Sequence, residues 1–268
     1  MSRLRKLLTA PAPSLALREA LPLRITPPGA TEAFLLFHGF SGYPGEMGEL
    51  AKGLAAAGYA VFAPRFSGHG TRRGDLLLAK AEDWMQRAFD SYEEARAEYA
   101  QVYVLGHSMG ALLAAAAAIR FDVSRAVFLA PAFELSVRLI GPTRLAAPFV
   151  SVIRDNKRPK AYALSIPDRS PLQKEYWSDL LVRPAAELER LRSLCRGALP
   201  RLKARTLVIV GDKDRTIPLG VAEYVKGRAA GSASVETRII QGGTHVFPFN
   251  EYSLPTLRMI LQWMGREA

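Results

Sequence analysis

A serine between two glycines has the clearest chemical setting in this sequence. The run at residues 106–110 (GHSMG) follows a short apolar stretch that ends at Leu105, and a helical pattern begins at Met109. A serine on such a strand–turn–helix connection sits on a strained turn, so small residues are needed two positions before and after it. The turn raises the hydroxyl at the edge of a sheet, where the positive end of the following helix faces it. The pattern predicts that Ser108 is a nucleophile.

A serine hydroxyl needs a base to remove its proton, and the sequence offers four histidines. His38 and His69 precede the serine and follow predicted strands, so we expect them in structural loops. His107 is adjacent to the serine and is expected to point away from it, into packing. His245 lies in a GGTH run after the last predicted strand, and it completes the chain order Ser, Asp/Glu, His. We therefore expect His245 to be the base.

A carboxylate must orient that histidine, and the loop at residues 211–218 (GDKDRTIP) contains two. We favour Asp214, because the third residue after the glycine has rounded the turn and can face the histidine. Asp212 remains the alternative, although an aspartate at that place can cap the turn's own backbone.

The negative charge of a tetrahedral intermediate requires fixed donors, typically two backbone N–H groups. Met109 directly follows the nucleophile and is expected to supply one. The turn at residues 38–42 (HGFSG) is expected to supply the other from Phe40, because Gly39 allows a tight turn there. The predicted site thus contains a nucleophile, a base, an acid and an oxyanion hole.

The elements that must position these residues follow an alternating pattern of short apolar runs and longer helical stretches, which indicates parallel strands joined by helices. Strands are predicted at residues 33–37, 59–63, 101–105, 125–129, 206–210 and 235–240, with a weaker edge strand at 21–25. Helices are predicted at residues 46–57, 79–99, 109–120, 219–229 and 254–264. Residues 131–202 interrupt this alternation with prolines, arginines and helical fragments such as 185–195, and no strand is predicted in them. We expect a core domain of residues 1–130 and 203–268 and a mainly helical cap insertion of residues 131–202.

The sequence resembles the α/β-hydrolase superfamily, in particular bacterial carboxylesterases and monoacylglycerol lipases, over residues 31–130 and 204–265. The shared motifs are HGF at 38–40, SGHG at 67–70, GHSMG at 106–110, GxxDxxIP at 211–218 and GGTH at 242–245. The resemblance implies an α/β-hydrolase fold with a mostly parallel central sheet flanked by helices. It also implies Ser108, Asp214 and His245 as a catalytic triad, Phe40 and Met109 as oxyanion donors, and a cap over the acyl pocket.

The predicted activity is that of a serine carboxylic-ester hydrolase on small acyl esters: the acyl group is transferred to Ser108, an alcohol leaves, and water activated by His245 completes hydrolysis. This chemistry requires no metal or cofactor. A thioesterase, an acyltransferase or a carbon–carbon bond hydrolase would use the same triad, and a non-catalytic binding member of the fold is a further alternative. Apolar residues of the cap are expected to line or cover the acyl site, or to form a core beneath the cap: Leu139, Ile140, Phe149, Ile153 and Trp177.

The net charge of +11 over 268 residues is unevenly distributed. Residues 131–205 contain 15 basic and 7 acidic residues, whereas residues 31–130 contain 9 and 11. A basic cap could contact an anionic lipid surface, and an ordinary solvated surface is the alternative. The basic segments contain no interleaved aromatic motif or recognised module, so we expect no nucleic-acid partner.

The chain contains one cysteine, Cys195, so no disulfide can form within it, which favours a reducing, cytoplasmic location. Pro11, Pro13 and Arg18 interrupt the leucines near the N-terminus before they reach the length of a signal peptide. No apolar run approaches the ~20 residues of a membrane span. The sequence leaves the oligomeric state open.

Overall fold

The computed structural model describes residues 3–9, 18–136, 141–154, 176 and 179–266. Its centre is a seven-stranded sheet with the order β1-β3-β2-β4-β5-β8-β9. The strands are β1 (Leu23–Ile25), β2 (Glu32–Phe37), β3 (Ala60–Ala63), β4 (Gln101–His107), β5 (Arg125–Leu129), β8 (Arg205–Gly211) and β9 (Val235–Ile240). Six of these seven strands were predicted, and each lies within two residues of its expected bounds: β2, β3, β4, β5, β8 and β9.

All strand pairs in this sheet are parallel except that of β1 with β3. The weakly predicted edge strand is therefore present but short, and it pairs Leu23 with Ala63 in the antiparallel sense. Pro22 lies just before it, at a strand start on a sheet edge, where the missing N–H is tolerated. The expected mostly parallel central sheet is confirmed.

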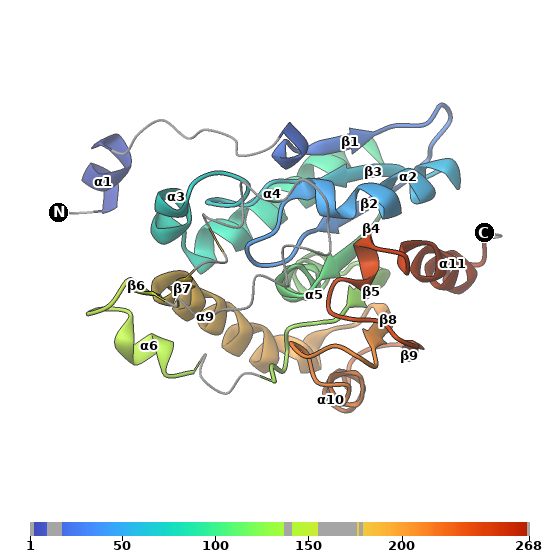
Figure 1. Ribbon diagram of the computed structural model, residues 1–268. Helices are drawn as coiled ribbons and strands as arrows, with labels where there is room; N and C mark the ends of the chain where they lie inside the picture. Colours follow the sequence, from blue (N-terminus) through green and yellow to red (C-terminus); the bar gives the residue numbers. More distant parts are fainter. Residues whose placement is uncertain (1–2, 10–17, 137–140, 155–175, 177–178, 267–268) are drawn as a thin grey trace.

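Helices cover both faces of the sheet (Figure 1). On one face α2 (Gly48–Ala56) contacts α11 (Ser253–Met264), and on the other α4 (Ala81–Glu98) contacts α5 (Met109–Phe121). The helices are α1 (Arg3–Thr9), α2 (Gly48–Ala56), α3 (Arg73–Leu78), α4 (Ala81–Glu98), α5 (Met109–Phe121), α6 (Thr143–Ala146), α9 (Val182–Ala198), α10 (Val221–Arg228) and α11 (Ser253–Met264). Short 3₁₀ turns are η1 (Arg18–Ala20), η2 (Pro44–Met47), η5 (Leu199–Arg201) and η6 (Phe247–Phe249). Within the described part of the chain, no helix has the length and apolar character that a membrane crossing requires.

The predicted helix at 79–99 begins two residues later than expected. Ala79 and Lys80 are extended, and the backbone N–H of Lys80 donates to the Asp83 carboxylate at 2.9 Å. This contact satisfies a backbone donor at the start of α4 and separates it from α3, which the sequence pattern did not predict.

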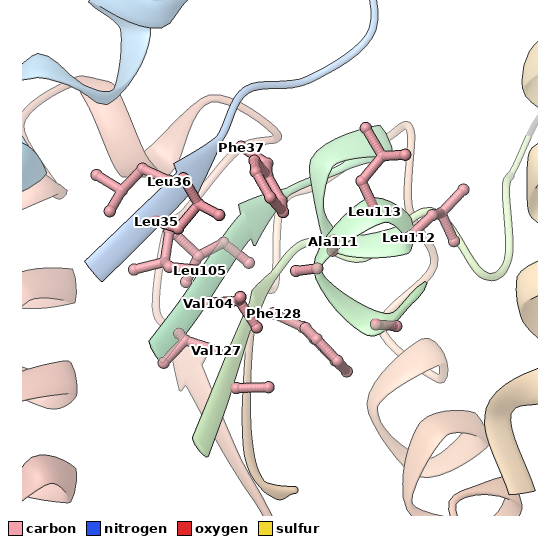
Figure 2. Packing of buried hydrophobic residues seen from close by; sticks show 14 of the residues in the cluster. Leu35, Leu36, Phe37, Val104, Leu105, Ala111, Leu112, Leu113, Val127 and Phe128 are labelled. Carbon is pink, nitrogen blue, oxygen red and sulfur yellow. The ribbon is translucent and has the colours of Figure 1, made fainter. Parts of the chain in front are cut away.

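Helix α5 lies between the sheet and α9. Figure 2 shows Phe128 of β5 and Ala111 of α5 between the strands and the helix, whereas Leu112 points away from the strands. All three side chains are fully buried. The Cys195 thiol of α9 donates to the Leu112 carbonyl at 3.4 Å, so α9 covers the outer side of α5. The helix that follows the serine is therefore packed on two sides, which holds its N-terminus in place.

Residues between β5 and β8 add α6, α9 and a two-stranded antiparallel ribbon of β6 (Val152–Arg154) and β7 (Asp179–Leu181). The expectation that this segment contains no strand was wrong. Strands of three residues carry too little alternation to be recognised from sequence.

Candidate active site

Ser108 lies on a sharp turn between β4 and α5, as the glycine spacing predicts. Its backbone has φ 55° and ψ −114°, a strained conformation for a residue with a side chain. A Cβ atom on Gly106 would lie 2.1 Å from the Gly110 carbonyl oxygen, and one on Gly110 would lie 2.0 Å from that of Phe37. Both contacts are far too short for any larger residue, so Gly106 is required within the turn and Gly110 by the close approach of β2.

The structure brings His245 and Asp214 to Ser108. The distance from His245 Nε2 to Ser108 Oγ is 3.2 Å, and His245 Nδ1 lies 2.8 Å from Asp214 Oδ2. Ser108 and His245 are each 8% exposed, so little water reaches the pair. The three side chains form a continuous chain from hydroxyl through imidazole to carboxylate.

The two aspartates of the 211–218 loop have different partners. Asp214 Oδ2 faces His245, while its Oδ1 accepts from the backbone N–H groups of Thr216 and Ile217 at 2.7 and 2.9 Å. Asp212 Oδ1 instead accepts from the N–H of Gly242 at 2.7 Å. Asp212 thus fixes the loop that carries the histidine, and Asp214 contacts the histidine itself.

The surroundings of Asp214 favour its ionised form. Burial alone disfavours the carboxylate charge, but it is outweighed by the hydrogen bond and charge of His245 and by the two backbone donors, so the pKa of Asp214 is lowered. A carboxylate that stays charged can hold the histidine proton on Nδ1, which leaves Nε2 free to accept the serine proton.

The turn at residues 39–42 lies directly beside the serine. It is closed by a hydrogen bond from the Gly42 N–H to the Gly39 carbonyl at 3.1 Å. A Cβ on Gly39 would lie 3.5 Å from the Ser108 Cβ, so the chain passes close to the nucleophile here. On the other side of Ser108, Met109 begins α5, and the first N–H groups of a helix have no partner within it. Met109 therefore adjoins Ser108, and Phe40 lies in the turn whose first residue, Gly39, approaches the serine.

His107 has a contact that the sequence did not suggest. It is buried, as expected, but its Nε2 donates to the backbone carbonyl of His245 at 2.9 Å. The two rings lie 4.9 Å apart, and Phe249 packs edge-on against the His107 ring at 5.1 Å. The residue before the nucleophile thereby supports the loop that carries the base. The partners are 138 residues apart, so no sequence pattern connects them.

The other two histidines are buried side by side, 5.2 Å between ring centroids. Burial lowers the pKa of His38 well below its usual value and that of His69 to about 4, so both rings are neutral near pH 7. The His38 ring is placed between the Gly39 carbonyl and the Phe66 N–H, at 3.0 and 3.4 Å. These contacts are those of the structural loop residues that the sequence predicts.

Of the residues predicted to line or cover the acyl site, Leu139, Ile140 and Trp177 lie outside the described residues. Phe149 is 88% exposed and Ile153 is 48% exposed, so the structure does not bury either of them at the triad. Among the described residues, no group of three or more histidine, cysteine, aspartate or glutamate side chains is arranged to hold a metal ion.

A parallel sheet covered by helices, with a serine–histidine–aspartate chain at the carboxyl ends of its strands, defines the α/β hydrolases. The family model described as the alpha/beta hydrolase family matches residues 34–254. The chain belongs to this family, and the expected fold is confirmed.

Among relatives of known name, the chain is 29% identical over 211 residues to the thermostable monoacylglycerol lipase of Bacillus sp. (strain H-257), covering 77% of this chain and 79% of that protein. It is 34% identical over 90 residues to the carboxylesterase of Bacillus subtilis (strain 168), covering 33% of this chain and 37% of that protein. Among solved structures, one from work on the metagenome-derived lipolytic enzymes LipS and LipT gives a TM-score of 0.80 at 23% identity, covering 93% of this chain and 98% of that one. The monoacylglycerol lipase of Paleococcus ferrophilus gives 0.71 at 19% identity, with 91% and 97% covered. At these identities the two structures support the fold alone.

Proposed function

We propose that this chain is a serine ester hydrolase that works through an acyl-enzyme on Ser108. The observation that carries the proposal is the chain of contacts from Ser108 Oγ to His245 at 3.2 Å and on to Asp214 at 2.8 Å, built on a strained turn. Ester hydrolysis as the reaction is also supported by the two Bacillus relatives, which are named as a monoacylglycerol lipase and a carboxylesterase.

In the first half-reaction, Ser108 Oγ attacks the carbonyl carbon of the ester while its proton moves to His245 Nε2. The carbonyl oxygen becomes an oxyanion, which the N–H groups of Met109 and Phe40 stabilise. When the tetrahedral intermediate collapses, the bond to the alcohol oxygen breaks and His245 returns the proton to that oxygen. The acyl group stays on Ser108.

In the second half-reaction, a water molecule gives a proton to His245 Nε2 and attacks the acyl carbon. Collapse of the second intermediate releases a carboxylic acid and returns the proton to Ser108 Oγ. Asp214 keeps the histidine in the required tautomer throughout and stabilises the imidazolium that forms.

We also propose that residues 131–202 form a cap over the acyl site. This segment connects β5, which ends at Leu129, to the neighbouring strand β8, so it leaves the sheet near the carboxyl end where Ser108 lies. One cap residue contacts a loop of the core: the Tyr176 hydroxyl donates to the Gly68 carbonyl at 2.8 Å and accepts from the Thr71 N–H at 2.8 Å. A side chain of the cap therefore holds the loop that carries His69.

The test is labelling by a fluorophosphonate probe combined with a substrate panel. Ser108→Ala is expected to abolish both labelling and the hydrolysis of p-nitrophenyl esters. Ser193→Ala, which alters an exposed serine of α9, is the matched control and is expected to leave both unchanged. Labelling of the Ser108→Ala variant at the wild-type level would refute the assignment.

The panel should contain p-nitrophenyl esters, monoacylglycerols and acyl-coenzyme A thioesters. Monoacylglycerol is the first natural ester to test, because the Bacillus sp. relative that covers most of the chain is named for it. Turnover of thioesters alone would favour the thioesterase alternative, which needs the same three residues. Labelled Ser108 with no ester turnover in the panel would also contradict the ester hydrolase proposal.

A further inference from the structure

The most exposed large apolar side chains of the described residues occur in two short segments. Leu4 and Leu8 of α1 are 75% and 86% exposed, and Leu145 of α6 and Phe149 just after it are 80% and 88% exposed. Every other exposed large apolar residue in the described part is 56% exposed or less, and Ile153 of β6 is one of these at 48%. Single exposed leucines are common, but side chains that project this far are not explained by core packing.

Each segment arranges its apolar side chains on one helical face. Leu4 and Leu8 are four residues apart in α1. Leu145 and Phe149 are also four apart, and the helical turn continues past α6 because the Ala146 carbonyl accepts from the N–H of Val150 at 2.8 Å. Residues four apart in a helix lie on the same side. Both segments are therefore small amphipathic elements with an uncovered apolar face.

The charges of both segments have one sign. Residues 1–18 contain four basic residues and no acidic one, and residues 135–154 contain three basic residues and no acidic one. Acidic and basic residues are mixed over most of the rest of the chain, but residues 190–211 contain six basic residues and no acidic one. The nearest acidic residues in the sequence to the two apolar segments, Glu19, Glu134 and Asp155, lie just outside them. Exposed apolar side chains whose segment carries only cations are typical of elements that lie in the interface of an anionic membrane.

Contacts of the described residues place the two segments at one end of the molecule. Arg3 of α1 pairs with the Asp83 carboxylate at the start of α4. The Glu187 carboxylate of α9 accepts from the Ala81 N–H, also at the start of α4, at 3.2 Å. Helix α6 in turn contacts α9.

Figure 1 shows both segments on the same side of the molecule. Helix α1 lies at the upper left and α6 at the lower left, and α11 lies at the far side. In this view neither α1 nor α6 lies beside α11.

We propose that α1 and the residues 143–153 form a docking surface for a membrane with anionic headgroups. The docking surface is defined by the side chains of Leu4, Leu8, Leu145, Phe149 and Ile153. A second copy of this chain is a poor partner, because pairing would bring cationic segments together. This role goes beyond the proposed reaction and does not require Ser108. It gives Phe149 and Ile153 a contact with lipid rather than with the bound acyl chain.

The test is co-sedimentation of the full chain with vesicles of phosphatidylcholine alone and of an equimolar mixture of phosphatidylcholine and phosphatidylglycerol. The Ser108→Ala variant is used beside the wild type so that lipid turnover cannot alter the vesicles. We expect binding to the mixed vesicles that weakens as salt is raised, and at least tenfold weaker binding to phosphatidylcholine. No binding to the mixed vesicles, or equal binding to both, would overturn the proposal.

Paired substitutions locate the surface. Leu145→Ser with Phe149→Ser is expected to weaken binding to the mixed vesicles at least tenfold, and Arg144→Gln about fivefold. The matched control is Leu219→Ser with Leu254→Ser, which removes two leucines that are 45% and 52% exposed outside the docking surface. An equal loss in the control pair would overturn the proposal.

Two further measurements separate docking from folding and self-association. The thermal unfolding temperature is expected to be the same for the Leu145/Phe149 variant and the wild type, because both side chains are exposed and make no core packing. If the chain does not hydrolyse esters, binding to the mixed vesicles is still expected, so the two proposals can be refuted independently. A wild type that elutes as a dimer and a Leu145/Phe149 variant that elutes as a monomer would show that the face joins two copies, and would refute lipid docking.

Discussion

The substitution Asp214→Asn should remove most of the activity while it leaves the fold intact. Asp214 Oδ1 accepts two backbone hydrogen bonds, from Thr216 at 2.7 Å and Ile217 at 2.9 Å. In an asparagine of the same shape, only the amide oxygen can occupy that place. The amide nitrogen must then face His245 Nδ1, where the carboxylate now lies at 2.8 Å.

This orientation forces the wrong histidine tautomer. An amide N–H facing Nδ1 requires Nδ1 to accept, so the ring proton moves to Nε2, which faces Ser108 Oγ at 3.2 Å. A protonated Nε2 cannot take the serine proton. A loss in kcat on the order of 10⁴-fold is expected from such a tautomer change, which corresponds to about 5 kcal/mol in the activation free energy.

The assay is the steady-state hydrolysis of a p-nitrophenyl ester, with Asp212→Asn as the matched control. Asparagine at position 212 keeps an oxygen that can accept from the Gly242 N–H, so kcat should fall less than about tenfold. Thermal unfolding should show that both variants fold. Equal losses in the two variants, or a tenth of the wild-type kcat retained by Asp214→Asn, would refute this assignment of the two carboxylates.

Three further outcomes follow from buried groups. Burial lowers the pKa of His69 to about 4, so between about pH 4 and pH 6.5 the unfolded chain binds a proton at this residue that the folded chain does not. The free energy of unfolding is therefore at its full value above about pH 6.5, and up to about 3 kcal/mol of it is lost as the pH falls to about 4. Urea titrations across this range should show a smaller loss for His69→Gln, and an unchanged slope would contradict the account. The Cys195 thiol, whose pKa burial raises to about 12, should resist iodoacetamide until the protein unfolds; rapid alkylation of the native protein would contradict its placement. His107→Phe, which removes the donor to the carbonyl of the base, should lower kcat about tenfold with KM unchanged; His107→Gln, which retains a donor, should recover part of the loss.

Much of the fold was predictable because its signals are local. A buried parallel strand appears as a short apolar run, and a helix as a repeat of 3.6 residues, so both can be recognised within a window of the sequence. The predictions failed where an element is very short, or where a contact with a residue distant in the sequence helps to determine its bounds. The ribbon of β6 and β7 has three residues in each strand. At the start of α4 the Lys80 N–H donates to Asp83, and the Ala81 N–H donates to Glu187, which is 106 residues away.

By itself the sequence determined the setting of Ser108, because the glycines at 106 and 110 mark a strand–turn–helix connection within five residues of chain. It also indicated His245 through the chain order and the absence of another suitable histidine. Only the tertiary structure separated Asp214 from Asp212 and connected His107 to the loop of the base. Those contacts join residues 31 and 138 positions apart, and their distances depend on how the strands are ordered in the sheet. A local sequence pattern does not specify whether a side chain points toward a residue that is so far away in the chain.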